Sequence, residues 1–87
     1  MKHHLKLNKR FADAVYSGDI RFEIRNNDRA FQKGDEVEFS VVDDDGRKYR
    51  RRGEDHPIED ITFEISFVLS GWGLKDGYVV FGIKEKK

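Results

Sequence analysis

The residues best suited to bind a ligand are two acids and two arginines close together in the chain: Glu23, Arg25, Asp28 and Arg29. The guanidinium group of arginine makes paired hydrogen bonds to phosphates and base edges, and a neighbouring carboxylate can orient it or accept a proton. This block therefore indicates a nucleotide or other anion site. The alternative is a structural ion-pair cluster that only fixes the chain at a turn.

Alternation places the block at the end of a strand. Phe22 and Ile24 alternate with charged residues within Ile20–Arg25, so the apolar side chains share one face and the charged side chains share the other. Asn27 and Asp28 then favour a turn, because short polar side chains bond their own backbone and tolerate positive φ. We expect the charged face of this strand to point outward into a hollow shared with other elements.

Three further features could contribute to binding. Lys6, on an expected first strand over Leu5–Leu7, either reaches the same hollow or faces solvent. Trp72 lies between two glycines, where its ring either stacks on a base or covers one end of the fold. The five cations within residues 47–52 either follow a phosphate backbone or neutralise Asp43–Asp45 across a hairpin.

One short helix is expected near the start of the chain. Asn8 is typical of a helix N-cap and Gly18 of the left-handed residue that follows a helix, which predicts a helix over about Lys9–Ser17. Phe11 and Val15 belong to its expected apolar stripe, which packs on the rest of the protein.

The rest of the chain has the two-residue period of strands. Alternation predicts strands over four segments: 20–25, 36–41, 61–69 and 78–83. In the third segment the apolar residues from Ile61 to Leu69 are expected on one face. Residues 47–52 could add a return strand after the Asp45-Gly46 turn, and residues 84–87 are expected to be a frayed tail.

One helix and five or six short strands in 87 residues leave little core to share. A sheet closed on itself removes exposed edges, so we expect a small β-barrel with the helix at one end. The expected fold class is mostly β within α+β, in a single domain over residues 1–87.

Composition excludes several classes of protein. The 17 basic and 17 acidic residues cancel, which argues against indiscriminate polyanion binding and requires any nucleic-acid site to be a local patch. Cysteine is absent, the three histidines lack metal-ligand spacing, and no dinucleotide or P-loop motif is present, so we expect no metal and no cofactor. No apolar segment is long enough to span a bilayer and no secretion signal is visible, which favours a cytoplasmic monomer without membrane contact.

Three stretches carry a resemblance to a known family: His3-x-Leu5-Lys6, the block from Phe22 to Asp35, and Gly73 to Ile83. They resemble the DUF3850 family, which is common in phage and bacterial genomes and belongs to the ASCH group within the PUA-like fold. The resemblance spans nearly the whole chain and is weakest over residues 42–59. It implies a small β-barrel with a cleft between barrel and helix, and RNA binding as the proposed role.

Some ASCH relatives hydrolyse N4-acetylcytidine. Their pattern has a lysine two positions after the helix-ending glycine and a threonine five positions after it, where this chain has Ile20 and Glu23. Isoleucine cannot replace the lysine in activation, so that reaction is not expected. Arg25 matches the arginine of these relatives, which indicates a retained binding cleft.

Three functions remain open. The first is an RNA- or nucleotide-binding module, in which Arg25 and Arg29 make charge-assisted contacts while Glu23 and Asn27 distinguish donors from acceptors on a base. The second is a hydrolase of a modified nucleoside with Glu23 as general acid/base. The third is a phage accessory protein that binds another protein through a sheet edge or the Gly71–Gly73 loop, for which a contiguous apolar surface patch is expected.

Overall fold

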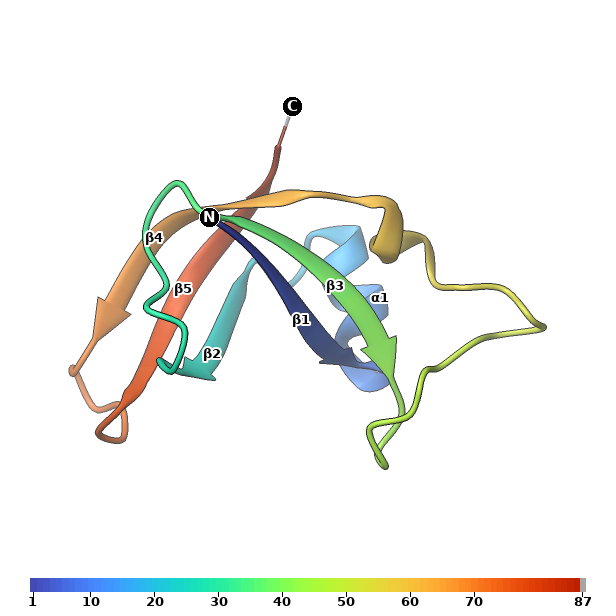
Figure 1. The fold of residues 1–87 in the computed structure, drawn as a ribbon, viewed down its shortest axis with the longest axis horizontal. Helices are drawn as coiled ribbons and strands as arrows, with labels where there is room; N and C mark the ends of the chain where they lie inside the picture. Colours follow the sequence, from blue (N-terminus) through green and yellow to red (C-terminus); the bar gives the residue numbers. More distant parts are fainter. Residues whose placement is uncertain (87) are drawn as a thin grey trace.

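The computed structural model describes residues 1–86 and contains one five-stranded sheet with one α-helix (Figure 1). The elements are β1 (Lys2–Asn8), α1 (Lys9–Ser17), β2 (Phe22–Asn26), β3 (Glu36–Val42), the 3-10 helix η1 (Pro57–Asp60), β4 (Phe63–Ser70) and β5 (Tyr78–Glu85). The strand order is β1-β3-β4-β5-β2, in which β1 runs parallel to β3 and the other neighbours are antiparallel. The expected fold class, mostly β within α+β, is confirmed.

The expected closed barrel is wrong, because β1 and β2 remain the two edge strands of the sheet. The sheet divides into two wings, β1–β3 beside α1 and β4–β5–β2, which diverge in Figure 1. The wings are joined by β3 and β4, which pair only at Glu36↔Glu64 and Val37↔Phe63 before they separate. Such a short junction bends the sheet strongly without bringing β1 and β2 into register with each other.

The helix α1 has the predicted bounds and both predicted caps. Asn8 Oδ1 accepts a hydrogen bond from the Arg10 amide at 2.9 Å, and Gly18 has a φ of 94° after the last turn. The face turned to the core differs from the expected stripe, because Ala12 and Val15 are buried whereas Phe11 is 51% exposed. Among residues 1–86, no helix has both the length and the apolar character needed to cross a bilayer.

The core lies between the concave face of the sheet, α1 and η1. Ten strand residues supply most of it: Leu5, Leu7, Val37, Phe39, Val41, Phe63, Ile65, Val79, Phe81 and Ile83. The cluster also contains Ala12 and Val15 of α1, Ile58 of η1, and Phe31. Phe31 belongs to the β2–β3 connection, and its ring lies 4.7 Å from His3 and 4.8 Å from Phe81 between ring centroids. The connection is thus anchored across the open side of the bent sheet.

A β-bulge in β4 overturns the expected alternation of the long strand. Its pairing with β5 shifts by one residue between Ile65 and Phe67. Because a one-residue shift moves every following side chain to the other face, Phe67 and Leu69 point to solvent and Val68 packs against the core.

The middle and the end of the chain also differ from expectation. Residues 47–52 form no strand and make only the isolated bridges Val42↔Lys48 and Arg51↔Glu54. Residues 84 and 85 belong to β5 instead of a frayed tail, since they pair with β4. Lys87 lies outside the described residues.

Phe31 and Phe11 provide a matched test of this packing. Phe31→Ala should lower the free energy of unfolding by about 3 kcal/mol, because it empties a buried site between the connection and the sheet. Phe11→Ala should cost less than about 1 kcal/mol, because half of that ring is already in water. Urea unfolding followed by circular dichroism measures both, and equal losses would contradict the described position of Phe31.

Candidate functional site

The charged face of β2 points toward the core side of the sheet, not outward as expected. Glu23 is the cross-strand partner of Phe81, and Arg25 is the partner of Val79, so all four side chains share the concave face. The apolar residues Phe22 and Ile24 consequently face solvent.

Two arginines bridge the gap between the edge strands. Arg25 Nη2 donates to the Lys6 carbonyl oxygen at 2.6 Å and to Glu23 Oε1 at 2.7 Å, and its Nε donates to the same carboxylate oxygen at 3.1 Å. Arg29 Nη1 donates to the His4 carbonyl oxygen at 2.9 Å. In a parallel strand alternate residues direct their polar groups to opposite sides, so the carbonyls of His4 and Lys6 lie on the edge of β1 that faces away from β3. Guanidinium groups therefore satisfy acceptors that a closed barrel would pair with β2.

Burial raises the pKa of Glu23, and the adjacent Arg25 guanidinium offsets only part of the rise. The pair is well shielded, since 12% of the Glu23 side chain and 26% of the Arg25 side chain remain exposed. The carboxylate thus has the environment of a proton-holding group, although its hydrogen-bond partner Arg25 is a cation.

The other predicted site residues are not gathered at this gap. Lys6 alternates with buried leucines, so its side chain points to the convex face while only its carbonyl meets Arg25. Asn27 Oδ1 accepts from the Phe31 amide at 3.1 Å and so stabilises the turn. Asp28 is exposed, and Trp72 is 88% exposed and covers no part of the core. The structure therefore brings together Glu23, Arg25, Arg29 and the backbone of Lys6.

A buried histidine fastens the β2–β3 connection to β1. His3 is 3% exposed, and its Nε2 lies 2.8 Å from Asp35 Oδ2. Burial tends to raise the pKa of Asp35, but hydrogen bonds from His3, the Gln32 amide and the N-terminal amine outweigh it and lower that pKa. The connection is thus held at Asp35 as well as at Phe31 and Arg29.

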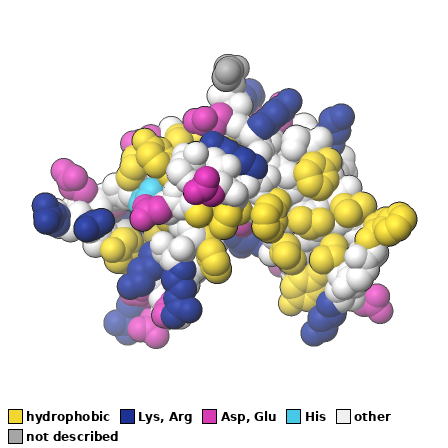
Figure 2. Space-filling model, turned by 180° about the vertical axis from the view of Figure 1, so that it is seen from behind, with side chains coloured by type: hydrophobic (Ala, Val, Ile, Leu, Met, Phe, Trp, Pro, Cys, Tyr) yellow, Lys and Arg dark blue, Asp and Glu magenta, His cyan; other side chains and the backbone are white. Residues whose placement is uncertain are grey.

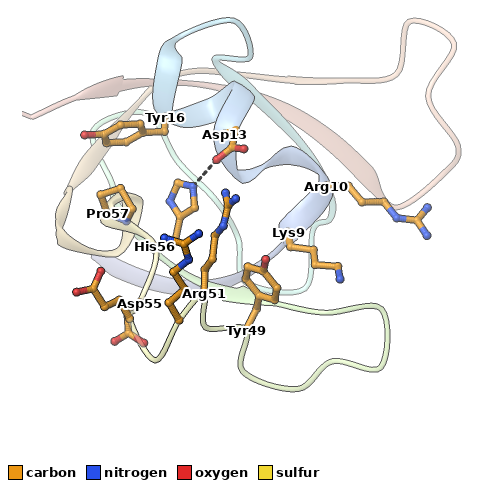
Figure 3. A pocket seen from close by; sticks show the side chains of 11 residues that line it. Lys9, Arg10, Asp13, Tyr16, Tyr49, Arg51, Asp55, His56 and Pro57 are labelled. Atoms are coloured by element: carbon orange, nitrogen blue, oxygen red, sulfur yellow. Dashed lines mark hydrogen bonds and ion pairs between the residues drawn. The ribbon is translucent and has the colours of Figure 1, made fainter.

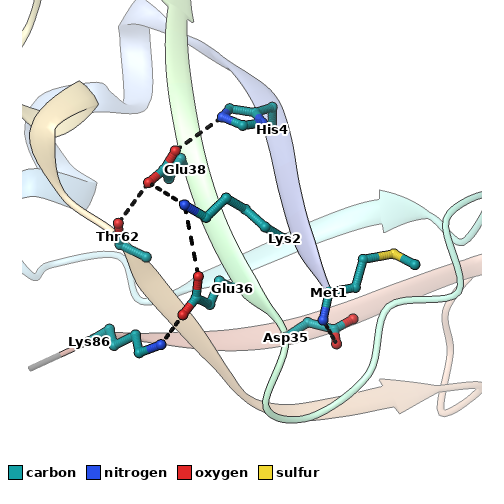
Figure 4. Close-up of polar contacts among 8 residues, drawn as sticks. All are labelled: Met1, Lys2, His4, Asp35, Glu36, Glu38, Thr62 and Lys86. Carbon is teal, nitrogen blue, oxygen red and sulfur yellow. Dashed lines mark hydrogen bonds and ion pairs between the residues drawn. The ribbon is translucent and has the colours of Figure 1, made fainter.

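The convex face of β1 and β3 carries paired charges (Figure 4). Glu38 accepts from the Thr62 hydroxyl at 2.8 Å and from Lys2 at 3.2 Å, and these hydrogen bonds lower its pKa. Glu36 pairs with Lys2 and Lys86 in the same network. Because these cations already have carboxylate partners, this face offers little to an anionic ligand.

A groove that the sequence did not predict lies between α1 and the segment 49–57, with a volume of about 710 Å³ (Figure 3). Its walls combine four cations, three carboxylates, two tyrosines and a histidine; the lining residues are Lys9, Arg10, Asp13, Tyr16, Tyr49, Arg51, Arg52, Glu54, Asp55, His56 and Pro57. In Figure 3 the Asp13 side chain of α1 points at His56 of the 49–57 segment, whereas Arg10 points away from the other labelled side chains.

Three cations of the groove have no acidic partner. Arg10 pairs with Asp44, but Lys9, Arg51 and Arg52 form no ion pair with any carboxylate of the described chain. Lys9 Nζ lies instead 5.1 Å from the centroid of the Tyr49 ring, within the range of a cation–π contact. Positive charge is therefore available to an anion here.

The far wall of the groove is fixed by His56. Its Nδ1 accepts from the Ile58 amide at 3.1 Å and caps η1, so Nε2 is the nitrogen that donates to Asp13 Oδ1 at 2.7 Å. Tyr16 meets the same imidazole edge-on, with ring centroids 5.7 Å apart. These contacts join α1 to η1 and orient Tyr16 beside the groove.

A strained turn presents the arginines. The Arg51 and Glu54 backbones exchange two hydrogen bonds of 2.9 and 3.0 Å around Arg52 and Gly53, which have φ values of 53° and 79°. Positive φ at both central positions defines a type I′ turn, which favours Asn-Gly and disfavours a long side chain at the first position. Backbone strain of this kind often marks a functional position.

The sequence contained only one signal for this groove, the run of cations within residues 47–52. Tyr16 and His56 are far apart in the chain and meet only because α1 packs against η1.

The protein is thus a small α+β domain with an arginine-bridged open sheet and a groove lined by charged residues and two tyrosines. It belongs to the family described as Domain of unknown function (DUF3850), whose model matches residues 2–83. A comparison with curated proteins gives no match.

The raised pKa of Glu23 predicts a particular dependence of stability on pH. The native state holds this proton more tightly than the unfolded chain, so the stability that Glu23 contributes falls as pH rises from about 4.5 through the raised pKa. The difference in unfolding free energy between the wild type and Glu23→Gln should therefore decrease over that window. Urea unfolding of both proteins between pH 3 and 8 measures this difference.

Glu38 provides the control of opposite sign. Because its pKa is lowered, its contribution is complete above about pH 4.5 and is lost as pH falls. The difference between the wild type and Glu38→Gln should therefore increase as pH rises from 3 to 5. Parallel profiles for the two variants would show that burial does not dominate at Glu23.

Proposed function

We propose that this protein is an RNA- or nucleotide-binding module whose ligand lies in the groove between α1 and residues 49–57. The observation that carries the proposal is the convergence of three cations without acidic partners and two tyrosines on one hollow. The zero net charge of the chain makes such a local patch the only plausible source of affinity for a polyanion.

Each wall of the groove supplies both a cationic and an aromatic contact. Lys9, Arg51 and Arg52 would bind phosphate oxygens, with the arginines able to do so through two parallel N–H groups. Tyr16, which is half exposed, would stack on a base, and stacking of this kind contributes about 1–3 kcal/mol per base. Tyr49 already meets Lys9 and would take part only if that lysine moved to a phosphate.

Single-stranded or splayed RNA fits these contacts better than a duplex. Bases in a duplex are stacked on one another, whereas aromatic side chains bind bases that are exposed. The resemblance to the ASCH group and its PUA-like fold supports the same class of ligand, and a cysteine-free chain suits the cytoplasm that the proposal assumes.

The role of the 22–35 segment in binding stays a prediction. Arg25 and Arg29 each use an N–H group to hydrogen-bond a carbonyl of β1, which leaves fewer N–H groups for a ligand. Lys9, Arg51 and Arg52 make no side-chain hydrogen bond to the backbone of the described residues, and for this reason we assign the ligand to the groove.

Nuclear magnetic resonance titration with short single-stranded RNA tests the assignment. Amide shifts should concentrate in residues 9–16 and 49–57, and Arg51→Gln should weaken binding and flatten the dependence of log K on log salt by about 0.7, the value for one phosphate on a single strand. Arg47→Gln removes a neighbouring cation outside the groove and should change affinity by less than twofold, apart from general charge.

Arg52→Asn sharpens the same test, because the residue is held in a strained turn. Asparagine suits that position, so the free energy of unfolding of the variant should rise by up to about 1 kcal/mol, as measured by urea unfolding. The same variant should bind RNA more weakly. Shifts confined to residues 22–35, with unchanged affinity in both groove variants, would move the site to the gap between β1 and β2.

The second candidate function is hydrolysis of an acylated nucleoside, favoured by the raised pKa of Glu23. Glu23 does not line the groove between α1 and residues 49–57. Incubation with N4-acylated cytidines is expected to give no turnover above that of Glu23→Gln; turnover that depends on Glu23 would establish the enzyme and displace the binding module.

A further inference from the structure

The convex face of the β4–β5–β2 wing is apolar. Cross-strand pairing aligns its side chains in two rows over the three strands, Phe22–Gly82–Phe67 and Ile24–Val80–Leu69. Paired residues point to the same side of a sheet, so the two rows form one continuous surface, here called the apolar face. Figure 2 shows hydrophobic side chains gathered over this wing.

The β-bulge and one glycine build this surface. The bulge turns Phe67 and Leu69 outward, away from the core that strict alternation would have given them. A Cβ on Gly82 would collide with the Phe67 ring, so the absence of a side chain there lets the ring lie down on β5. The apolar face is thus specified by backbone features and is more than a chance cluster of exposed residues.

Trp72 lies two residues beyond the end of β4, in the loop next to the apolar face. It is 88% exposed and has a φ of 51°, between Gly71 and Gly73, which also have positive φ. A bulky residue in this conformation is costly, yet the loop places the indole in water instead of in the core. Exposed tryptophan is among the residues that contribute most to protein interfaces.

We propose that the apolar face binds the same face of a second copy, as a two-fold dimer. The rings of Phe22, Phe67 and Trp72 expose on the order of 400 Å² between them. With Ile24 and Leu69, two copies would bury at most about 1,200 Å² if all five side chains were fully covered, which reaches the lower end of the range for specific interfaces. Apolar patches of this size on a protein surface are often functional.

The charged groups at the rim of the apolar face are compatible with binding of a second copy. The next cross-strand pair along β4 and β5 is Glu64 and Lys84, whose charged groups lie 3.4 Å apart. At this edge the charges are neutralised, so the apolar face can meet its own copy there without the repulsion that an unpaired charge would cause.

The dimer would leave the RNA groove open. The groove lies beside α1 and η1, on the wing opposite to β4–β5–β2 (Figure 1). Two grooves on one dimer would bind a longer strand with greater avidity than either groove alone. The dimer itself does not depend on the groove or its ligand, and it differs from the monomer expected from the sequence.

Sedimentation equilibrium tests the dimer. The wild type should dimerise with a dissociation constant on the order of 10 μM, as expected for a small interface. Ile24→Lys places a charge at the centre of the apolar face and should raise that constant at least tenfold. Phe11→Lys adds the same charge at an equally exposed ring on α1 and should leave it unchanged.

Trp72 gives an independent readout because it is the only tryptophan. Its emission should shift to shorter wavelength as the wild type is concentrated from about 1 to 100 μM, and should not shift in Ile24→Lys. Circular dichroism establishes that each variant is folded. A wild type that stays monomeric up to about 1 mM, or equal weakening by Phe11→Lys, would overturn the proposal.

Discussion

The interaction on which the structure depends is the hydrogen bonding of two guanidinium groups to the edge of β1. Arg25 and Arg29 donate to the carbonyls of Lys6 and His4 and so hold β1 near β2 without strand pairing. A strand edge exposes backbone acceptors that need partners, and closure of a barrel is one way to supply them. Here side chains from the neighbouring edge strand and its turn supply two of them.

An open sheet has consequences on both wings. On the β1–β3 wing, α1 packs beside the strands and against η1, and the groove forms between α1 and the segment before η1. On the β4–β5–β2 wing, β2 needs its polar residues on the concave face to reach β1, and its apolar residues are therefore turned to solvent. The same orientation of β2 thus produces both the arginine bridge and the exposed apolar face.

The sequence predicted features that depend on neighbouring residues. Asn8 and Gly18 defined α1 because capping is local, and alternation located β2, β3 and β5. The sequence could not predict which way β2 would face, since Phe22 and Ile24 satisfy the period of a strand whichever side is buried. The bulge that turns Phe67 outward and the meeting of Tyr16 with His56 depend on tertiary pairing, which alternation does not encode.

Amide hydrogen exchange of Arg25→Met, with Arg47→Met as control, tests the central claim most directly. If the guanidinium group fastens β1, amides of residues 3–7 should exchange faster relative to those of β4 and β5, while RNA affinity changes no more than in the control. Unchanged protection of β1 together with a selective loss of RNA affinity would contradict the account, because it would make Arg25 a ligand-binding residue and not a bridge between edge strands.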